Sequence, residues 1–174
     1  MAFAPSSLIL ANNFLPLNEA LRYSMDYSFS IDTFNEYWKS TKNVVERYLS
    51  DDLNEELAII CANKLWHLCD WYYKENENSL NLNQLSDFQG LCGNENTNLR
   101  ILRDICNGSK HGTIEKTRNP MIRKASKRAG AFSSAFSRGF DVSVLEVELT
   151  DGEVFYFDDI VKDVYQFWLD KIEP

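Results

Sequence analysis

The chain has few of the residues and motifs from which enzyme sites are most often built. Only two histidines, His67 and His111, occur in its 174 residues. Neither belongs to a HExxH zinc motif, and there is no GxSxG nucleophile turn and no glycine-rich phosphate loop. The sequence therefore gives no support to a zinc protease, an α/β-hydrolase or a P-loop nucleotidase.

Closely paired cysteines are also missing. Cys61, Cys69, Cys92 and Cys106 lie in apolar or helical stretches, and no CxxC pair occurs among them. A zinc site made of thiolates needs closer pairing than this. We expect four buried free thiols in a protein of the reducing cytoplasm, with no metal and no cofactor.

Long hydrophobic runs are absent as well. Near the start of the chain, Leu8–Leu10 is a short apolar run that no Lys or Arg precedes and that Pro16 soon follows. A membrane-spanning helix needs roughly 20 apolar residues, and a secretion signal needs a basic start. Because hydrophobic residues make up 44% of the chain, we expect a soluble globular domain that does not enter a membrane.

Charge is present but unevenly distributed. The formal net charge is −8, yet residues 110–138 contain one acid, Glu115, and eight basic residues: Lys110, Lys116, Arg118, Arg123, Lys124, Lys127, Arg128 and Arg138. Such a segment indicates binding to a polyanion such as RNA, or docking on an acidic surface of the chain itself or of a partner. A solvated mobile loop is the third interpretation.

The apolar spacing predicts a mainly α protein, an antiparallel helical bundle with a C-terminal β-hairpin and a final helix. We expect a single domain overall, with an N-terminal arm (1–30), a helical bundle core (31–112), a basic loop segment (113–139), and a hairpin plus last helix (140–174). Within the basic segment, a short helix over Met121–Ala129 is an alternative to loop.

Several local signals set the element boundaries. Thr33 and Glu36 form a Thr-x-x-Glu capping box before a helix of about 17 residues. Asp52 is the expected cap of the second helix, which should run to about Lys74. Thr150–Glu153, with Asp-Gly at its centre, predicts a hairpin turn, and Asp158 or Asp159 is the expected cap of the last helix.

Two polar rows have the same helical spacing. On the second helix the row contains Asn63, His67, Asp70 and Lys74, and Trp66 and Trp71 flank it. On the helix that ends near residue 112, the row is Arg100, Asp104, Asn107 and His111. If the two helices pack antiparallel, both rows line one seam and bring His67, Asp70, Asn107 and His111 within reach of each other.

The second row resembles the motif of the HEPN superfamily (higher eukaryotes and prokaryotes nucleotide-binding domains), an Arg with a polar follower and a later His on one helix. Here Arg103-Asp104 and His111 match it, at a longer interval than the family usually has. The resemblance, which covers about residues 31–112, implies a metal-independent endoribonuclease with a composite site in a homodimer. Asn107-x-x-Lys110-His111 also resembles a motif of uncharacterised bacterial helical proteins that often carry an upstream motif like His67-Leu-Cys-Asp70-Trp71.

Three functions follow as hypotheses. The first is a non-catalytic or regulatory interaction module of a bacterial defence or toxin–antitoxin-type system, whose basic segment meets a polyanion or an acidic protein. The second is the HEPN-like ribonuclease, with His111 as base or acid, Arg103 and Lys110 stabilising charge, and Asn107 orienting the substrate. The third is a small metal-binding helical protein that uses His67, Asp70 and His111.

Overall fold

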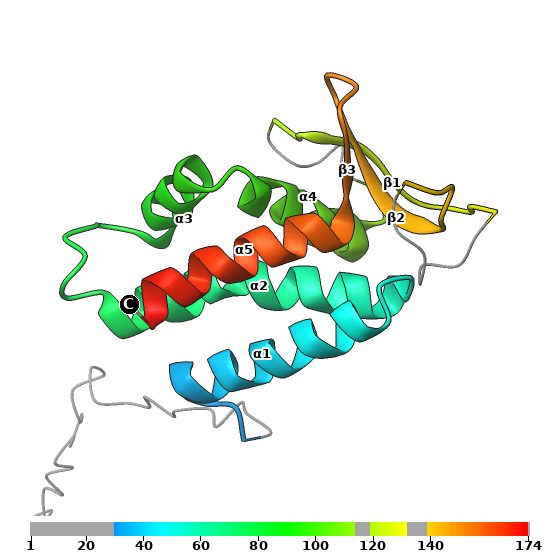
Figure 1. Cartoon of the computed structure of the whole chain (residues 1–174). Coiled ribbons are helices and arrows are strands. Elements are labelled where there is room, and N and C mark those ends of the chain that lie inside the picture. Colours follow the sequence, from blue (N-terminus) through cyan, green and yellow to red (C-terminus); the bar gives the residue numbers. More distant parts are fainter. Residues whose placement is uncertain (1–29, 114–118, 132–138, 174) are drawn as a thin grey trace, which may run out of the picture. The chain divides into compact units, whose positions relative to one another are not determined.

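The computed structural model describes residues 30–113, 119–131 and 139–173, and this part of the chain is mainly helical (Figure 1). Its five helices are α1 (Phe34–Ser50), α2 (Glu55–Asn76), α3 (Leu85–Glu95), α4 (Asn98–His111) and α5 (Phe157–Ile172). A three-stranded antiparallel sheet has the order β1 (Ile122–Arg128), β2 (Val144–Leu149), β3 (Val154–Tyr156). The predicted mainly α class is confirmed, and the predicted N-terminal arm lies outside the described residues except for Ser30.

The predicted capping box of α1 is confirmed. The Glu36 backbone N–H donates to Thr33 Oγ1 at 3.2 Å, and the Thr33 N–H donates to Glu36 Oε2 at 3.2 Å. These bonds satisfy amide groups that have no partner in the first turn of a helix. The apolar side chains then repeat every three or four residues, so one face of α1 is buried.

The predicted cap of α2 was wrong by two residues. Asn54, not Asp52, precedes the helix, and its Oδ1 accepts from the Leu57 N–H at 3.1 Å. The Asn54 amide also donates to Asp51 Oδ2 at 2.9 Å, which holds the side chain in its capping position. From there α2 continues to Asn76, slightly beyond the expected end.

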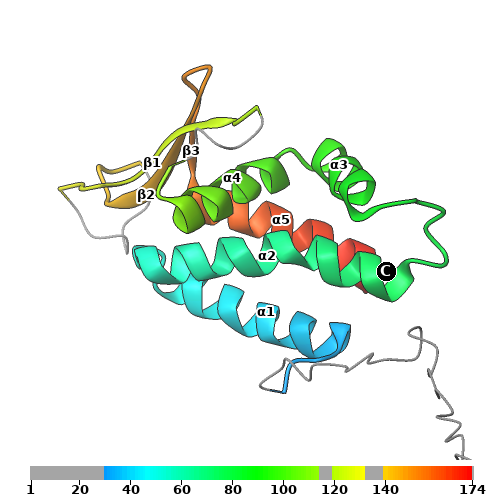
Figure 2. The same ribbon diagram turned by 180° about the vertical axis from the view of Figure 1, so that it is seen from behind.

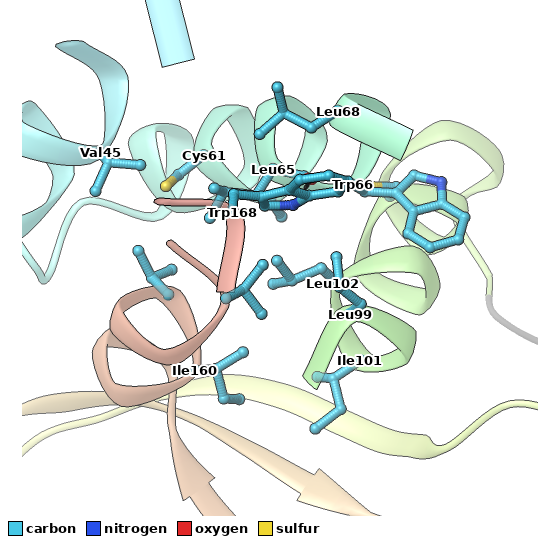
Figure 3. Close-up of a cluster of buried hydrophobic side chains, with 14 of the residues drawn as sticks. Val45, Cys61, Leu65, Trp66, Leu68, Leu99, Ile101, Leu102, Ile160 and Trp168 are labelled. Atoms are coloured by element: carbon cyan, nitrogen blue, oxygen red, sulfur yellow. Dashed lines mark hydrogen bonds between the residues drawn. The ribbon is translucent and has the colours of Figure 1, made fainter. Parts of the chain in front are cut away.

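Helix α2 is the central element of the helical part, because it contacts each of the other four helices. Figure 2 shows it between α1 on one side and α4 and α5 on the other. The core forms where these helices meet, and Trp168 of α5 is fully buried there beside Leu65 and Leu102 (Figure 3). The Trp168 indole N–H donates to the carbonyl of Leu65 at 3.1 Å, so its one polar group is satisfied. All four cysteines are buried free thiols, as predicted.

The prediction of a loop or short helix within residues 113–139 was wrong for residues 122–128, which form strand β1. Strand β1 pairs with β2 along its length, and Arg123 Nη1 lies 2.9 Å from Glu148 Oε1. At the other end, Arg128 forms ion pairs with Glu146 and Asp141. The alternating acids of β2 give the basic residues partners across the sheet, and this complementarity favours a strand over a helix with a weak apolar stripe.

The predicted hairpin is confirmed. β2 and β3 flank a turn at residues 150–153, in which Gly152 has φ +94° and its N–H donates to the Leu149 carbonyl at 3.1 Å. The cap predicted for the last helix was wrong, because Tyr156 precedes α5 and makes no side-chain cap bond. Asp158 and Asp159 lie inside the first turn, where carboxylates stabilise the helix through its dipole.

Sheet and helices meet through β2 and β3 on α5 and through β1 on α4. At one corner of the sheet, the residues that follow β1 lie close to the residues that precede β2. This approach depends on Gly130, whose N–H donates to Ser143 Oγ at 3.0 Å. A Cβ at Gly130 would overlap the backbone of Asp141 and Val142. The sheet corner can therefore form only with glycine at this position.

We expect Gly130→Ala to lower the free energy of unfolding by about 1–3 kcal/mol, because backbone atoms cannot move aside as a flexible side chain can. The matched control is Gly90→Ala, since nothing lies within 4 Å of a Cβ built there inside α3. Alanine in that helix interior should stabilise the protein by about 0.5–1 kcal/mol. Urea unfolding of both variants checks the two signs, and a stabilised Gly130→Ala protein would contradict the described corner.

Candidate functional site

A groove with both polar and apolar side chains in its walls lies between α2 and α4 and has a volume of about 480 Å³. Helix α2 contributes Ile59, Asn63, Trp66 and His67 to its walls, and α4 contributes Cys106, Asn107, Ser109 and Lys110. Members of the two polar rows expected from the sequence therefore face a common space. The motifs around His67 and Asn107 are brought together, although they are 40 residues apart in the chain.

His67 is held by a chain of side-chain hydrogen bonds. Its Nδ1 lies 2.7 Å from Asp70 Oδ2, and Gln89 Nε2 of α3 donates to Asp70 Oδ1 at 2.8 Å. A carboxylate only accepts, so the neutral imidazole carries its proton on Nδ1 and leaves Nε2 as a free acceptor. The His67 side chain is 46% exposed, so this acceptor is accessible from solvent.

The other polar groups of the groove differ in how far they are already engaged. Asn63 Nδ2 donates to the Ile59 carbonyl at 2.8 Å, which leaves Oδ1 as an acceptor. The side chains of Asn107 and Lys110 make no hydrogen bond or ion pair with any other residue that the structure describes. An amide and an ammonium that have no partner in the described part of the chain, next to a basic imidazole nitrogen, are suited to binding an anion.

Two groups of the groove are poor nucleophiles. Burial raises the pKa of the Cys106 thiol to about 12, so the thiolate that would react is scarce at neutral pH. Ser109 Oγ donates to the Cys106 carbonyl at 2.9 Å, and the surrounding α4 backbone is helical, with its N–H groups used within the helix. The groove therefore contains a proton acceptor, His67 Nε2, and anion-binding groups on Asn107 and Lys110, but no good protein nucleophile.

Arg103 does not line the groove. Its Nε and Nη2 donate to Asp104 Oδ1 at 2.9 and 2.7 Å, and Nη2 reaches the Asn119 carbonyl at 3.4 Å. Asp104 is fully buried, and its Oδ2 accepts from the Met121 and Ile122 N–H groups at 2.5 and 3.4 Å. This pair ties the start of β1 to α4, which is a structural contact.

His111 is also outside the groove. It is exposed at the last residue of α4, next to Gly112, whose positive φ of 68° ends the helix. Among the described residues no group of three or more His, Cys, Asp or Glu is placed to hold a metal ion. The set His67, Asp70 and His111 that the sequence suggested is thus not assembled as a ligand group.

The basic residues named from the sequence do not form one free patch. Lys127 Nζ donates to the Leu53 carbonyl at 3.2 Å, and both arginines of β1 are paired with acids of the sheet region. Lys124 has no partner among the described residues. Lys116, Arg118 and Arg138 lie outside the described part. For Arg123 and Arg128 of β1, the acidic partners belong to the chain itself, on β2 and just before it.

The sequence did not identify Gln89 as a site residue. Gln89 lies on α3, which Gln84 precedes, and its side chain turns towards Asp70 of α2. Trp71, expected to flank the polar row, instead stacks on Tyr37 with ring centroids 4.8 Å apart. No local pattern reports either contact, because both depend on how neighbouring helices pack.

No protein-family model, curated protein or solved structure matches this chain. Within the described ranges, none of the helices has the length and apolar character needed to cross a lipid bilayer.

We expect Asp70→Asn to remove the tautomer preference of His67, because the amide can donate to Nδ1 where the carboxylate could only accept. Nitrogen NMR of the imidazole would show Nδ1 protonated in the wild type and a mixed or reversed tautomer in the variant. Asp87→Asn, which changes an exposed carboxylate on α3 that contacts Gln84, should leave the His67 spectrum unchanged. An unaltered His67 spectrum in Asp70→Asn would contradict the hydrogen-bond chain.

Proposed function

We propose that this chain is a metal-independent ribonuclease whose groove between α2 and α4 binds the scissile phosphodiester. The observation that carries the proposal is the imidazole of His67, oriented by Asp70 beside the side chains of Asn107 and Lys110, which have no partner among the residues that the structure describes. RNA contains its own nucleophile, the 2′-hydroxyl, so a site with a base and an anion-binding group but no protein nucleophile suits this reaction.

In the proposed reaction, His67 Nε2 removes the proton from the 2′-hydroxyl, and the 2′-oxygen forms a bond to phosphorus. The bond from phosphorus to the 5′-oxygen breaks, and this oxygen takes a proton from water in the open groove. Lys110 and the Asn107 amide stabilise the negative charge that develops on the phosphoryl oxygens. The products are a 2′,3′-cyclic phosphate and a 5′-hydroxyl.

This proposal keeps the ribonuclease suggested by the HEPN resemblance but transfers the proton acceptor from His111 to His67. Arg103 is engaged by the buried Asp104, so Lys110 takes the part of the cation. We further propose an antiparallel helical bundle as the architecture, a cytoplasmic protein, and a homodimer as in that superfamily. The buried free cysteines support the reducing compartment.

The test is cleavage of labelled single-stranded RNA by the purified chain in the presence of EDTA. We expect products that end in a cyclic phosphate, and no cleavage of the same strand when it carries 2′-deoxy sugars. Cleavage of the deoxy strand, or intact RNA after prolonged incubation at high protein concentration, would refute the proposal.

A regulatory interaction module of a bacterial defence or toxin–antitoxin-type system is the second candidate. It is favoured by exposed aliphatic side chains on α2, where Ile59 is 41% and Ile60 38% exposed, since exposed apolar groups are common in interfaces. Under this proposal the groove receives an acidic partner side chain at Lys110. This candidate would be favoured if the chain leaves RNA intact but forms a stable complex with an acidic protein partner, and if Lys110→Glu disrupts that complex.

A further inference from the structure

A second recess adjoins the groove at Ile59. This residue lines both spaces, and the consecutive residues Ile105 and Cys106 of α4 line one each. The recess encloses about 160 Å³ between the start of α2, α4, the sheet and the start of α5. The two spaces are therefore neighbours along the same pair of helices.

The walls of the recess are apolar and its rim is acidic. Ala58, Val147 and Phe157 are buried wall residues, while Ala125 of β1 is exposed at the opening. Glu55, Ser126 and Glu146 supply the polar groups. Glu55 has no partner among the described residues, and Glu146 uses Oε2 for Arg128 Nε at 3.2 Å, which leaves Oε1 for another donor.

We propose that this recess binds a nucleobase that carries an exocyclic amino group, next to the phosphate held in the groove. The inference rests on the proposed ribonuclease function and specifies its substrate. Apolar walls accept the faces of a flat ring, and carboxylates accept hydrogen bonds from an amino group on its edge. Adenine, cytosine and guanine have such a group. Uracil has no such group: its ring N3–H is flanked by two carbonyl oxygens, which the carboxylates of Glu55 and Glu146 repel.

The charge of the recess and its continuity with the groove favour a nucleotide as the occupant. An aliphatic side chain of a protein partner would fill the walls but leave Glu55 and the Oε1 atom of Glu146 without a donor, which is unfavourable when they are covered. One nucleotide fits both spaces, with its phosphate at Lys110 in the groove and its base in the recess. The preference for an amino-bearing base also gives the substrate a sequence requirement that the phosphate site alone cannot supply.

The test is an NMR titration of the intact chain with the four nucleoside 3′-monophosphates and, separately, inorganic phosphate. The Asn107 side-chain amide reports the groove, and the methyl groups of Ala58 and Ala125 report the recess. We expect the amino-bearing nucleotides to shift both reporters and to bind about tenfold more tightly than uridine monophosphate. Inorganic phosphate should shift only the Asn107 amide.

Two variants with a matched control complete the design. Glu55→Gln should reduce the preference over uridine monophosphate severalfold, whereas Glu56→Gln, an exposed neighbour that lines neither space, should retain it. Ala125→Leu fills the opening and should abolish the preference without changing phosphate binding. Unfolding curves show whether each variant is folded.

The outcomes separate the two proposals. Nucleotides that shift Asn107 without base preference would overturn the base site and leave the ribonuclease proposal standing. Base-selective shifts in a chain that leaves RNA intact would support the recess as a base site and overturn the ribonuclease. If no nucleotide shifts the recess methyl groups while an aliphatic peptide does, the recess is a protein-docking site and the inference is wrong.

Discussion

His67→Ala is expected to lower the rate of RNA cleavage by about 10²–10⁴-fold, the range found when a general base is removed. The reason is geometric: His67 is the imidazole that lines the groove, and Asp70 fixes its proton on Nδ1 so that Nε2 can accept. The rate should be measured with labelled single-stranded RNA in EDTA. Binding of inorganic phosphate should change little, because Asn107 and Lys110 remain.

The chain contains the control for this experiment, because it has one other histidine. His111→Ala removes an exposed imidazole at the end of α4 and should leave the cleavage rate within about twofold of the wild type, as is usual for exposed positions away from a site. The reverse result, with His111 required and His67 dispensable, would restore the HEPN-like arrangement of Arg103 and His111. If both variants cleave RNA at the wild-type rate, neither imidazole acts as the base.

Asp104→Ala is expected to lower the free energy of unfolding by about 3–5 kcal/mol, as when one partner of a buried ion pair is removed. The substitution leaves the Arg103 guanidinium and the N–H groups of Met121 and Ile122 without their acceptor. For a chain of this size the melting temperature should fall by roughly 6–20 °C. Thermal unfolding followed by circular dichroism measures the change.

The matched control is Asp163→Ala on α5. Asp163 Oδ2 also accepts two hydrogen bonds, from Asn96 at 2.6 Å and Asn98 at 2.8 Å, but the residue is exposed. Water can replace the lost acceptor there, so the expected cost is only about 1 kcal/mol. Equal losses in the two variants would contradict the structural role assigned to the buried carboxylate.

The parts of the fold that the sequence predicted are those fixed by neighbouring residues. The capping box of Thr33 and Glu36 closes within three residues, and the turn around Gly152 needs only a positive φ at one position. Strand β1 was missed because its partners, Glu146 and Glu148, lie about 20 residues further along the chain. Without them, a run of basic residues has no period that distinguishes a strand from a loop.

The candidate site was predicted in location but not in membership. Helical spacing placed His67 and Asn107 on faces that meet once α2 and α4 pack, and the structure places both in one groove. The same spacing included Asp104 in the polar row, yet this residue is fully buried. Its burial depends on the Arg103 guanidinium and on the backbone N–H groups at the start of β1, and helical spacing carries no information on such contacts.

The Asp104 contact has a consequence for the order in which the chain folds. Helices α1 and α2 are adjacent in sequence and pack against each other. The residue before β1, in contrast, donates its N–H to the carboxylate of Asp104 on α4. Asp104 belongs to α4, so the start of β1 finds this acceptor only once α4 has formed. Bringing β1 next to β2 also closes a longer loop than the α1–α2 pair does, which costs more chain entropy. We therefore expect the helices to assemble early and the sheet late, with the amide hydrogens of Met121 and Ile122 gaining protection only after those of α4.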